Sequence, residues 1–171
     1  MFYDTNIPGC RIRDAVEADT GLILRFIREL ASYEQLLDRV VATEELLHHW
    51  LFEERKAEVV FCERNGEAAG YALFFHNFST FEGRAGIYLE DLFVLPTARG
   101  YGFGKALLRH VARLAVARGC ARVEWSCLNW NEPSIRFYKS LGARPLDEWT
   151  GFRLDGGALS SLGRAEQPMK G

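Results

Sequence analysis

The sequence predicts an α/β fold with a mixed, mostly antiparallel, twisted central sheet of about six to seven strands, flanked by about four helices. Two observations lead to this prediction. Asn65-Gly66 is a two-residue hairpin signal between apolar segments, so the strands on either side of it should be antiparallel. Further along, a helical segment separates two apolar strands, and such a crossover makes them parallel. At 171 residues and 48% hydrophobic, the chain can form one domain with a sizeable core.

A short strand and two helices are expected before the hairpin. The strand covers residues 10–14 and follows an N-terminal extension over residues 1–9. Residues 17–34 should form a helix, because apolar residues recur at the spacing of one helical face, namely Ile23, Phe26, Ile27 and Leu30. Thr43 is a candidate N-cap for a second helix that continues to about residue 54, with two glutamates in its first turn.

The hairpin begins an expected antiparallel meander. Its strands cover residues 57–64 and about 67–77, and the second of them is rich in aromatic residues. A polar loop over 78–84 then leads to an apolar strand over 86–95. We expect these three strands to be neighbours in the sheet.

The second half of the domain should complete the sheet. In order, we expect a helix over 104–118, a strand over 121–128, a short helix from Pro133 to Gly142, and strands near 143–148 and 151–155. Gly119 stands where a C-terminal cap glycine is expected, and proline is tolerated in a first helical turn. These elements define a single domain over residues 10–155, followed by a C-terminal segment over 156–171 that we expect to be partly loose.

Charge and composition argue against several classes of protein. The formal net charge is −2 and the pI about 6.1, so the basic excess of a nucleic-acid-binding protein is missing. No apolar run approaches the roughly 20 residues that span a bilayer, and no secretory signal is recognisable, so we expect a cytoplasmic protein without a membrane partner. The four cysteines form no Cys-x-x-Cys pair and have no histidine at metal-ligand spacing, so we expect reduced thiols and no metal site.

A glycine-rich loop joins the last strand of the meander to the following helix. Its pattern is Arg-x-x-Gly-x-Gly, formed by Arg99, Gly102 and Gly104. A P-loop is excluded, because it would need glycine in place of Arg99 and a hydroxyl residue after Lys105, and the dinucleotide pattern Gly-x-Gly-x-x-Gly is incomplete. Backbone N–H groups at a helix N-terminus can hold phosphate. An ordinary strand-to-helix turn is the alternative.

Two adjacent carboxylates, Glu90 and Asp91, lie in the strand just before this loop. An anion-binding loop beside a carboxylate pair favours a phosphate-bearing cofactor next to a cationic or amine substrate. In a regular strand the two side chains would point to opposite faces. The plainer alternative is therefore one exposed and one salt-bridged carboxylate.

A second motif follows one strand later. Residues 131–142 read Asn-Glu-Pro-Ser-Ile-Arg-Phe-Tyr-Lys-Ser-Leu-Gly. Together with the glycine loop, this segment resembles the GNAT acetyltransferase superfamily, whose loop holds the pyrophosphate of coenzyme A. Within the superfamily the sequence is most similar to spermidine/spermine and thialysine N-acetyltransferases, over about residues 10–155. The segments that carry the likeness are residues 29–34, 88–94, 99–104 and 130–139.

The resemblance implies transfer of an acetyl group from acetyl-CoA to a primary amine of a diamine, polyamine or lysine-like amino acid. The transfer would be direct, within a ternary complex. The resemblance also implies a homodimer. Glu90 is the expected base, through a water, and Tyr138 the general acid for the departing thiolate. Similar enzymes carry a β-bulge here, which would let Asp91 serve the site too. The expected cofactor contacts are Leu92, Phe93, Val94, Arg99, Gly100, Tyr101, Gly102, Phe103, Gly104, Lys105, Asn131, Ser134 and Tyr138. The expected substrate contacts are Tyr33, Glu34, Glu90, Asp91, Glu124, Trp125 and Ser126.

Several of these residues have a structural alternative. Tyr138 and Trp125 could be core aromatics, whereas Arg99 and Glu34 could be solvated surface charges. Asn131 could cap the helix that follows it, and this role can coexist with a cofactor contact.

Two departures from the polyamine enzymes bear on the substrate. Ser79-Thr80-Phe81 stand where those enzymes carry Asp-Pro-Trp, with an apparent one-residue insertion, and Trp149-Thr150-Gly151-Phe152 lack the acidic residues found there. A long polycation should therefore bind less well than a short diamine or a lysine-like amino acid. Two other functions stay open at this point: a protein or peptide N-acetyltransferase on the same scaffold, and a non-catalytic acyl-CoA-binding regulatory module.

Overall fold

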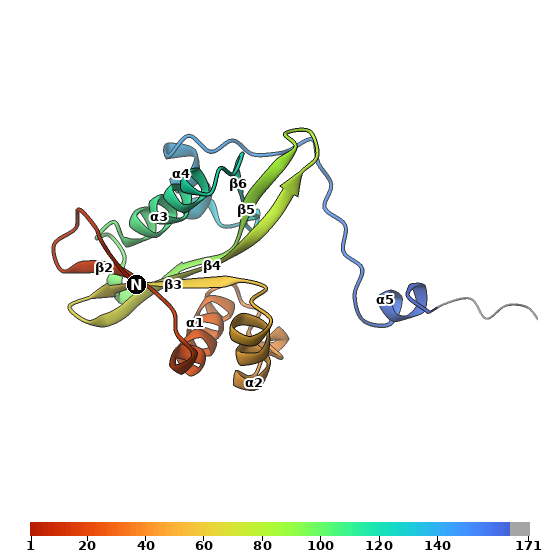
Figure 1. Ribbon diagram of the computed structural model, residues 1–171, viewed down its shortest axis with the longest axis horizontal. Helices are drawn as coiled ribbons and strands as arrows, with labels where there is room; N and C mark the ends of the chain where they lie inside the picture. Colours follow the sequence, from red (N-terminus) through yellow and green to blue (C-terminus); the bar gives the residue numbers. More distant parts are fainter. Residues whose placement is uncertain (165–171) are drawn as a thin grey trace, which may run out of the picture. The chain divides into compact units, whose positions relative to one another are not determined.

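A six-stranded sheet forms the frame of the first of two compact units (Figure 1). The computed structural model describes residues 1–164; the first unit is Met1–Ser126 and the second begins at Cys127. The strands lie in chain order, and each pair of neighbours is antiparallel except β5 and β6, which are parallel. They are β1 (Phe2–Asp4), β2 (Cys10–Asp14), β3 (Glu58–Arg64), β4 (Glu67–Ser79), β5 (Arg84–Val94) and β6 (Val123–Glu124).

The β3–β4 hairpin confirms the expected turn. Asn65 and Gly66 both have positive φ angles, 53° and 89°, as a type I′ turn requires. Asparagine tolerates the left-handed region and glycine adopts it without steric conflict, so this dipeptide sets the pairing next to the turn, and a register shift between Cys62 and Glu63 changes it further along. The loop between β4 and β5 is shorter than expected, because both strands extend further and leave only residues 80–83 between them.

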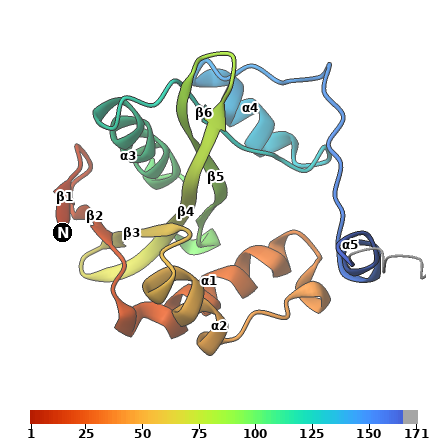
Figure 2. The ribbon, with the colours of Figure 1, turned by 45° about the vertical axis from the view of Figure 1, so that its right-hand side comes forward.

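Helices cover both faces of this sheet (Figure 2). α1 and α2 lie on one face and α3 on the other. The α-helices of the first unit are α1 (Thr20–Tyr33), α2 (Glu44–His48), which continues as a π-helical turn over His49–Glu53, and α3 (Phe103–Ala117). Short 3₁₀ turns cover Glu17–Asp19, Leu37–Arg39 and Pro96–Ala98. Thr43 caps α2 as expected, since its Oγ1 accepts a hydrogen bond from the N–H of Leu46 at 3.3 Å.

An aromatic core joins α1 to the sheet. Phe26 of α1 is fully buried, and its ring centroid lies 5.7 Å from that of Phe61 and 5.2 Å from that of Tyr71. On the opposite face, Leu107 and Val111 of α3 are fully buried. The apolar stripes that predict the two helices are therefore the faces that pack against the sheet.

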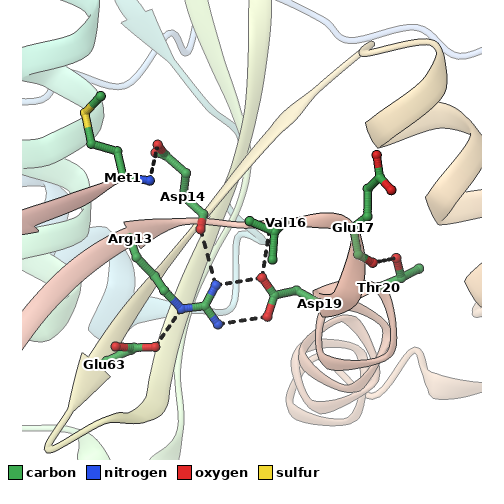
Figure 3. Close-up of polar contacts among 8 residues, drawn as sticks. All are labelled: Met1, Arg13, Asp14, Val16, Glu17, Asp19, Thr20 and Glu63. Atoms are coloured by element: carbon green, nitrogen blue, oxygen red, sulfur yellow. Dashed lines mark hydrogen bonds and ion pairs between the residues drawn. The ribbon is translucent and has the colours of Figure 1, made fainter.

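Arg13 ties β2 to β3 and to the start of α1 (Figure 3). Its guanidinium donates to Glu63 at 2.6 Å and to both carboxylate oxygens of Asp19, at 2.6 and 2.8 Å. Burial alone would raise the pKa of Asp19, but the hydrogen bonds from Arg13 and from the Val16 N–H outweigh it and lower that pKa below its ordinary value. A planar guanidinium matches this bidentate geometry.

The second unit differs from its expected structure. Within residues 127–164 it contains α4 (Glu132–Ser140) and α5 (Gly156–Leu162), and the strands expected near 143–148 and 151–155 are not formed. Pro145 lacks an N–H for strand pairing, and charged residues interrupt any apolar alternation in this stretch. The expectation of a loose tail beyond residue 164 lies outside the described residues.

Two strand boundaries also differ in the first unit. The N-terminal extension contains β1, which pairs with β2, and β6 is only two residues long instead of covering 121–128. β6 pairs with Ile87 and Tyr88 of β5, and the pairing ends where β5 becomes irregular.

None of the helices within residues 1–164 combines the length and apolar character that a membrane crossing requires.

We expect Arg13→Met to lower the free energy of unfolding by about 3 kcal/mol, because Asp19 would be left as a largely buried carboxylate without a cation and Glu63 would keep only the exposed Arg11. Urea denaturation at pH 7 measures this loss. Arg11→Met is the matched control, since Arg11 is 52% exposed and lies 3.6 Å from Glu63; it should change stability by no more than about 1 kcal/mol. Equal losses in the two variants would contradict the role assigned to Arg13.

Candidate active site

A β-bulge in β5 places the two candidate carboxylates differently. Leu73 of β4 is opposite Asp91 and the next residue, Phe74, is opposite Leu89, so Glu90 has no partner across the β4–β5 pair. Glu90 is exposed at the bulge. The alternation of a regular strand is broken here, which allows consecutive carboxylates to serve one region.

Asp91 is half-buried and bonded to a tyrosine. The hydroxyl of Tyr71, a fully buried residue of β4, donates to Asp91 Oδ2 at 2.6 Å. Burial raises the pKa of Asp91 to about 6, the negative charges of Glu90 and Glu34 add to the increase, and the Tyr71 hydrogen bond opposes it. The Tyr71 pKa is raised well above its ordinary value, mainly by burial and then by Asp91. The hydroxyl therefore stays protonated and remains a donor.

Glu34 brings a third carboxylate to this region from the C-terminal end of α1. It is half-buried, and burial raises its pKa. Glu34 and Glu90 both act electrostatically on Asp91 and on Tyr71. We call Glu34, Glu90 and Asp91 the carboxylate corner. A positively charged ligand is favoured there, because it would relieve the mutual repulsion of these groups.

Tyr71 was not among the residues selected from the sequence. It lies in an apolar strand, and the sequence indicates only an aromatic residue of the core. The sequence carried only a partial signal: the expected meander makes β4 and β5 neighbours, but the pairing of Tyr71 with Phe93, two residues from Asp91, depends on the β4–β5 register.

Arg99 is exposed, but its side chain contacts aromatic residues of α1 and β5. Its guanidinium carbon lies 4.5 Å from the ring centroid of Tyr33 and 5.5 Å from that of Phe93. Its Nε donates to the carbonyl of Val94 at 3.1 Å. The glycine loop is thus connected to the end of α1, where Tyr33 and Glu34 were expected to contact the substrate.

The glycine loop has the shape that its sequence predicts. Gly100 and Gly102 have φ angles of 84° and 85°, a conformation that residues with a side chain rarely adopt. Gly102 is the N-cap of α3, and the first intrahelical bond runs from Ala106 N to Gly102 O at 3.0 Å. The amide groups of the first turn therefore have no acceptor within the helix and can bind an anion. A Cβ at Gly100 would meet no atom within 4 Å, so the loop is open on that side.

Four other expected cofactor contacts complete this loop. Tyr101 stacks on Phe103, with ring centroids 5.8 Å apart, and also lies beneath the guanidinium of Arg64 at 4.1 Å. Phe103 is buried, so only its backbone is available for the expected cofactor contact. Gly104 is half-buried and Lys105 is exposed.

The edge of β5 next to the loop is open to new backbone partners. β6 pairs only with Ile87 and Tyr88, so no strand of the described chain pairs with that edge at Leu92, Phe93 and Val94. Unpaired backbone groups at such an edge can bind the amide groups of an extended ligand. This is the region in which the pantetheine arm was expected.

The expected substrate contacts of β6 and the following residues have partners in the first unit. Glu124 accepts a hydrogen bond from Asn77 at 2.8 Å and forms an ion pair with Arg122 at 2.8 Å, so its charge is already compensated. Ser126 Oγ lies 2.8 Å from the hydroxyl of Tyr88. Trp125 is half-buried. Glu124 therefore has less uncompensated negative charge than the carboxylate corner.

The remaining candidate residues belong to α4 of the second unit. Asn131 is buried and caps the helix, since its Oδ1 accepts a hydrogen bond from Ser134 N at 3.4 Å. Tyr138 is half-buried, and its ring lies 5.3 Å from that of Phe137. Among residues 1–164, no group of three or more histidine, cysteine or acidic side chains is arranged to hold a metal ion.

The raised pKa of Asp91 predicts a pH-dependent effect on stability. The folded-state pKa of about 6 lies above the usual value near 3.9 of an unfolded chain, so ionised Asp91 destabilises the fold as pH rises through 6. Asp91→Asn should therefore increase the free energy of unfolding by about 2 kcal/mol at pH 8 and have little effect at pH 4. Urea denaturation at both pH values tests this, with exposed Glu90→Gln as the control, expected to change stability by no more than about 0.5 kcal/mol. A gain that is independent of pH would refute the assignment.

Comparison with known proteins gives the family. Residues 24–143 match the model of the acetyltransferase (GNAT) family. Thialysine N-epsilon-acetyltransferase of Sus scrofa is 40% identical over 163 residues, with 88% of this chain and 95% of that protein covered. L-ornithine N5-acetyltransferase of Arabidopsis thaliana is 32% identical, with 89% and 87% covered.

Solved structures agree with the sequence matches. An integron cassette protein from the mobile metagenome of V. cholerae superposes with a TM-score of 0.79 at 27% identity, and covers 92% of this chain and 99% of its own. The mixed, mostly antiparallel sheet expected from the sequence is thereby confirmed. The glycine loop and the 131–142 segment, from which the resemblance was drawn, both lie within the matched region. The chain therefore belongs to the acetyltransferase (GNAT) family.

Proposed function

We propose that this acetyltransferase moves an acetyl group from acetyl-CoA to a primary amine of a small molecule, either a short diamine or a lysine-like amino acid. The observation that carries the proposal is the carboxylate corner beside an anion-binding glycine loop. The relatives named for thialysine and for L-ornithine support the choice of acceptor, since both names describe small molecules that carry amines.

The loop and the open edge of β5 fit coenzyme A. The first-turn amides of α3, together with Gly100 and Gly102, would hold the diphosphate, and Leu92–Val94 would bind the pantetheine amides. When bound, acetyl-CoA supplies the activated thioester. Asn131 and Ser134 are proposed cofactor contacts from α4, a role compatible with the N-cap bond between them.

The carboxylate corner would bind and deprotonate the amine. An alkylammonium ion cannot attack a carbonyl, so a proton must first be removed. Glu90 is the proposed acceptor, through a water, because it stands exposed at the bulge. Asp91, whose pKa of about 6 is close to neutral pH, assists by attracting the cation and by sharing the proton. Glu34, with Tyr33 beside it, would hold the second charged group of the acceptor.

Tyr138 is the proposed general acid. A phenol with an ordinary pKa near 10 can donate a proton to a departing thiolate. No cysteine occupies a position of the two motifs, which favours direct transfer over an acyl-cysteine intermediate. We also propose a homodimer as the working form.

An acceptor panel tests this function. Purified protein is incubated with acetyl-CoA and diamines, ornithine, lysine analogues, spermine or lysine-containing peptides, and thiol release is followed. We expect the highest kcat/KM for short diamines or amino acids that carry a side-chain amine, and lower values for spermine. Turnover on peptides alone would indicate a peptide acetyltransferase. Acetyl-CoA binding without turnover on any acceptor would indicate a regulatory module, and either result would overturn the proposal.

Removing one hydroxyl tests the general acid. Tyr138→Phe should lower kcat about 100-fold and leave the Kd of acetyl-CoA within about threefold, since the role concerns the departing sulfur more than binding. Ser140→Ala is the matched control, because it removes a hydroxyl that bonds only the Phe137 carbonyl on the same helix. It should leave both constants unchanged. Normal turnover in Tyr138→Phe would eliminate the phenol as proton donor.

A further inference from the structure

β6 is joined to β5 by a very short ladder. Its two residues pair with Ile87 and Tyr88, and the Ile87 N–H donates to the carbonyl of Arg122, the residue before β6, at 3.0 Å. Strands usually pair over three or more residues, and parallel pairing is the less stable kind per residue. A ladder of this length therefore fixes the position and register of β6 only weakly, and other contacts must hold it in place.

Side chains of β4 reach across β5 and hold β6. The Asn77 amide donates from Nδ2 to Glu124 Oε2 at 2.8 Å, and Arg122 Nε forms an ion pair with the same oxygen, also at 2.8 Å. Arg122 in turn donates from Nη1 to Ser79 Oγ at 2.9 Å, and Ser79 is only 3% exposed. Two residues of β4 are thus bonded to Glu124 of β6 and to the residue before β6. We call Asn77, Ser79, Arg122 and Glu124 the β6 anchor.

Gly86 of β5 provides the space for this crossing. Asn77 and Gly86 are partners across the β4–β5 pair. A Cβ on Gly86 would collide with Asn77 Oδ1 and would lie 3.2 Å from the carbonyl oxygen of Arg122. The φ angle of Gly86 is outside the left-handed region, so the requirement for glycine is one of space and not of backbone conformation. A larger residue would push the Asn77 amide away from Glu124.

The other end of the Asn77 amide has an unfavourable environment. Its Oδ1 is buried without a hydrogen-bond partner among the residues that the structure describes. A carboxylate oxygen only accepts hydrogen bonds, so Nδ2 must face Glu124 and Oδ1 is left beside Gly86. Buried polar atoms are rarely left unsatisfied, and exceptions are expected where function sets the residue type. The bond to β6 is what Asn77 gains against this cost.

We propose that Asn77 is a positioning residue, which acts through Glu124 to fix the register of β6 and so keeps the edge of β5 at residues 92–94 free for the pantetheine arm of the coenzyme. The inference rests on the proposed use of acetyl-CoA. Slippage of β6 toward the C-terminal end of β5 would bring its backbone against that edge and occupy the groups that pantetheine would bind. The bulge at Glu90 does not prevent this, because it belongs to the β4–β5 pair on the other side of β5.

Calorimetry with two compounds tests the anchor in the absence of any acceptor amine. Coenzyme A carries the pantetheine arm, whereas adenosine 3′-phosphate 5′-diphosphate is the same molecule without it. Asn77→Asp places a second carboxylate against Glu124, so we expect the Kd of coenzyme A to rise about tenfold and that of the shorter compound to change less than about twofold. A general loss of structure would weaken the binding of both compounds alike.

Exchanging the donor and the acceptor provides a rescue. In the double variant Asn77→Asp/Glu124→Gln the bond between the two side chains can form again in the opposite direction, so the Kd of coenzyme A should return to within about threefold of the wild-type value. His76→Ala is the matched control, because His76 is the exposed neighbour of Asn77 on β4. It should leave both affinities unchanged.

A second pair of variants tests the space at Gly86. Gly86→Ala should reproduce the selective loss of coenzyme A affinity, whereas Gly83→Ala strains the same hairpin at a φ of 64° without meeting any atom, and should leave the ratio of the two affinities unchanged. Equal weakening of both compounds in Asn77→Asp, unchanged affinity in that variant, or no rescue in the double variant would overturn the anchor. Wild-type protein that binds no coenzyme A would instead overturn the proposed function, and the anchor with it, so the two failures are distinguishable.

Discussion

The bulge at Glu90 is the constraint on which the candidate site depends. One extra residue in β5 leaves Glu90 exposed and turns Asp91 toward Tyr71, so the two carboxylates have different environments although they are adjacent in sequence. The parallel pairing with β6 ends at Tyr88, just before the bulge. The same irregularity therefore provides both the acidic groups and the free edge of β5 beside the glycine loop.

The carboxylate corner holds unfavourable electrostatic interactions where we propose that the amine substrate binds. Asp91 is half-buried beside two other carboxylates, and its pKa of about 6 shows that the folded protein disfavours its charge. Tyr71 stabilises the ionised form by one hydrogen bond, but cannot neutralise it. An ammonium group would neutralise it, so binding of the proposed substrate would gain from relieving this repulsion. A site of this kind is less stable than an apolar one, as is common where function sets the residue types.

Local sequence signals predicted the parts of the fold that are determined locally. The Asn65-Gly66 turn, the α1 stripe and the glycine loop each follow from the conformational preferences of a few residues. The absence of the strands expected at 143–148 and 151–155, and the two-residue length of β6, depend on pairing partners that local patterns do not specify. The same is true of the site: Glu90 and Asp91 were recognisable as a pair, whereas the Tyr71–Asp91 bond and the Arg99–Tyr33 stack arise from strand register and loop path.

The net charge of −2 conceals a separation of charge within the first unit. Asp91 shares a sheet face with Tyr71 and Phe93, the face on which α1 packs, and Glu34 lies at the end of that helix. Lys105, Arg109 and Arg113 belong to α3 on the opposite face (Figure 2). Between them stands the apolar sheet core, where a charge would be strongly disfavoured. The two groups therefore cannot neutralise each other through direct contact, and each keeps the potential that attracts a ligand of opposite charge. Composition alone, which averages over both faces, could not reveal either group.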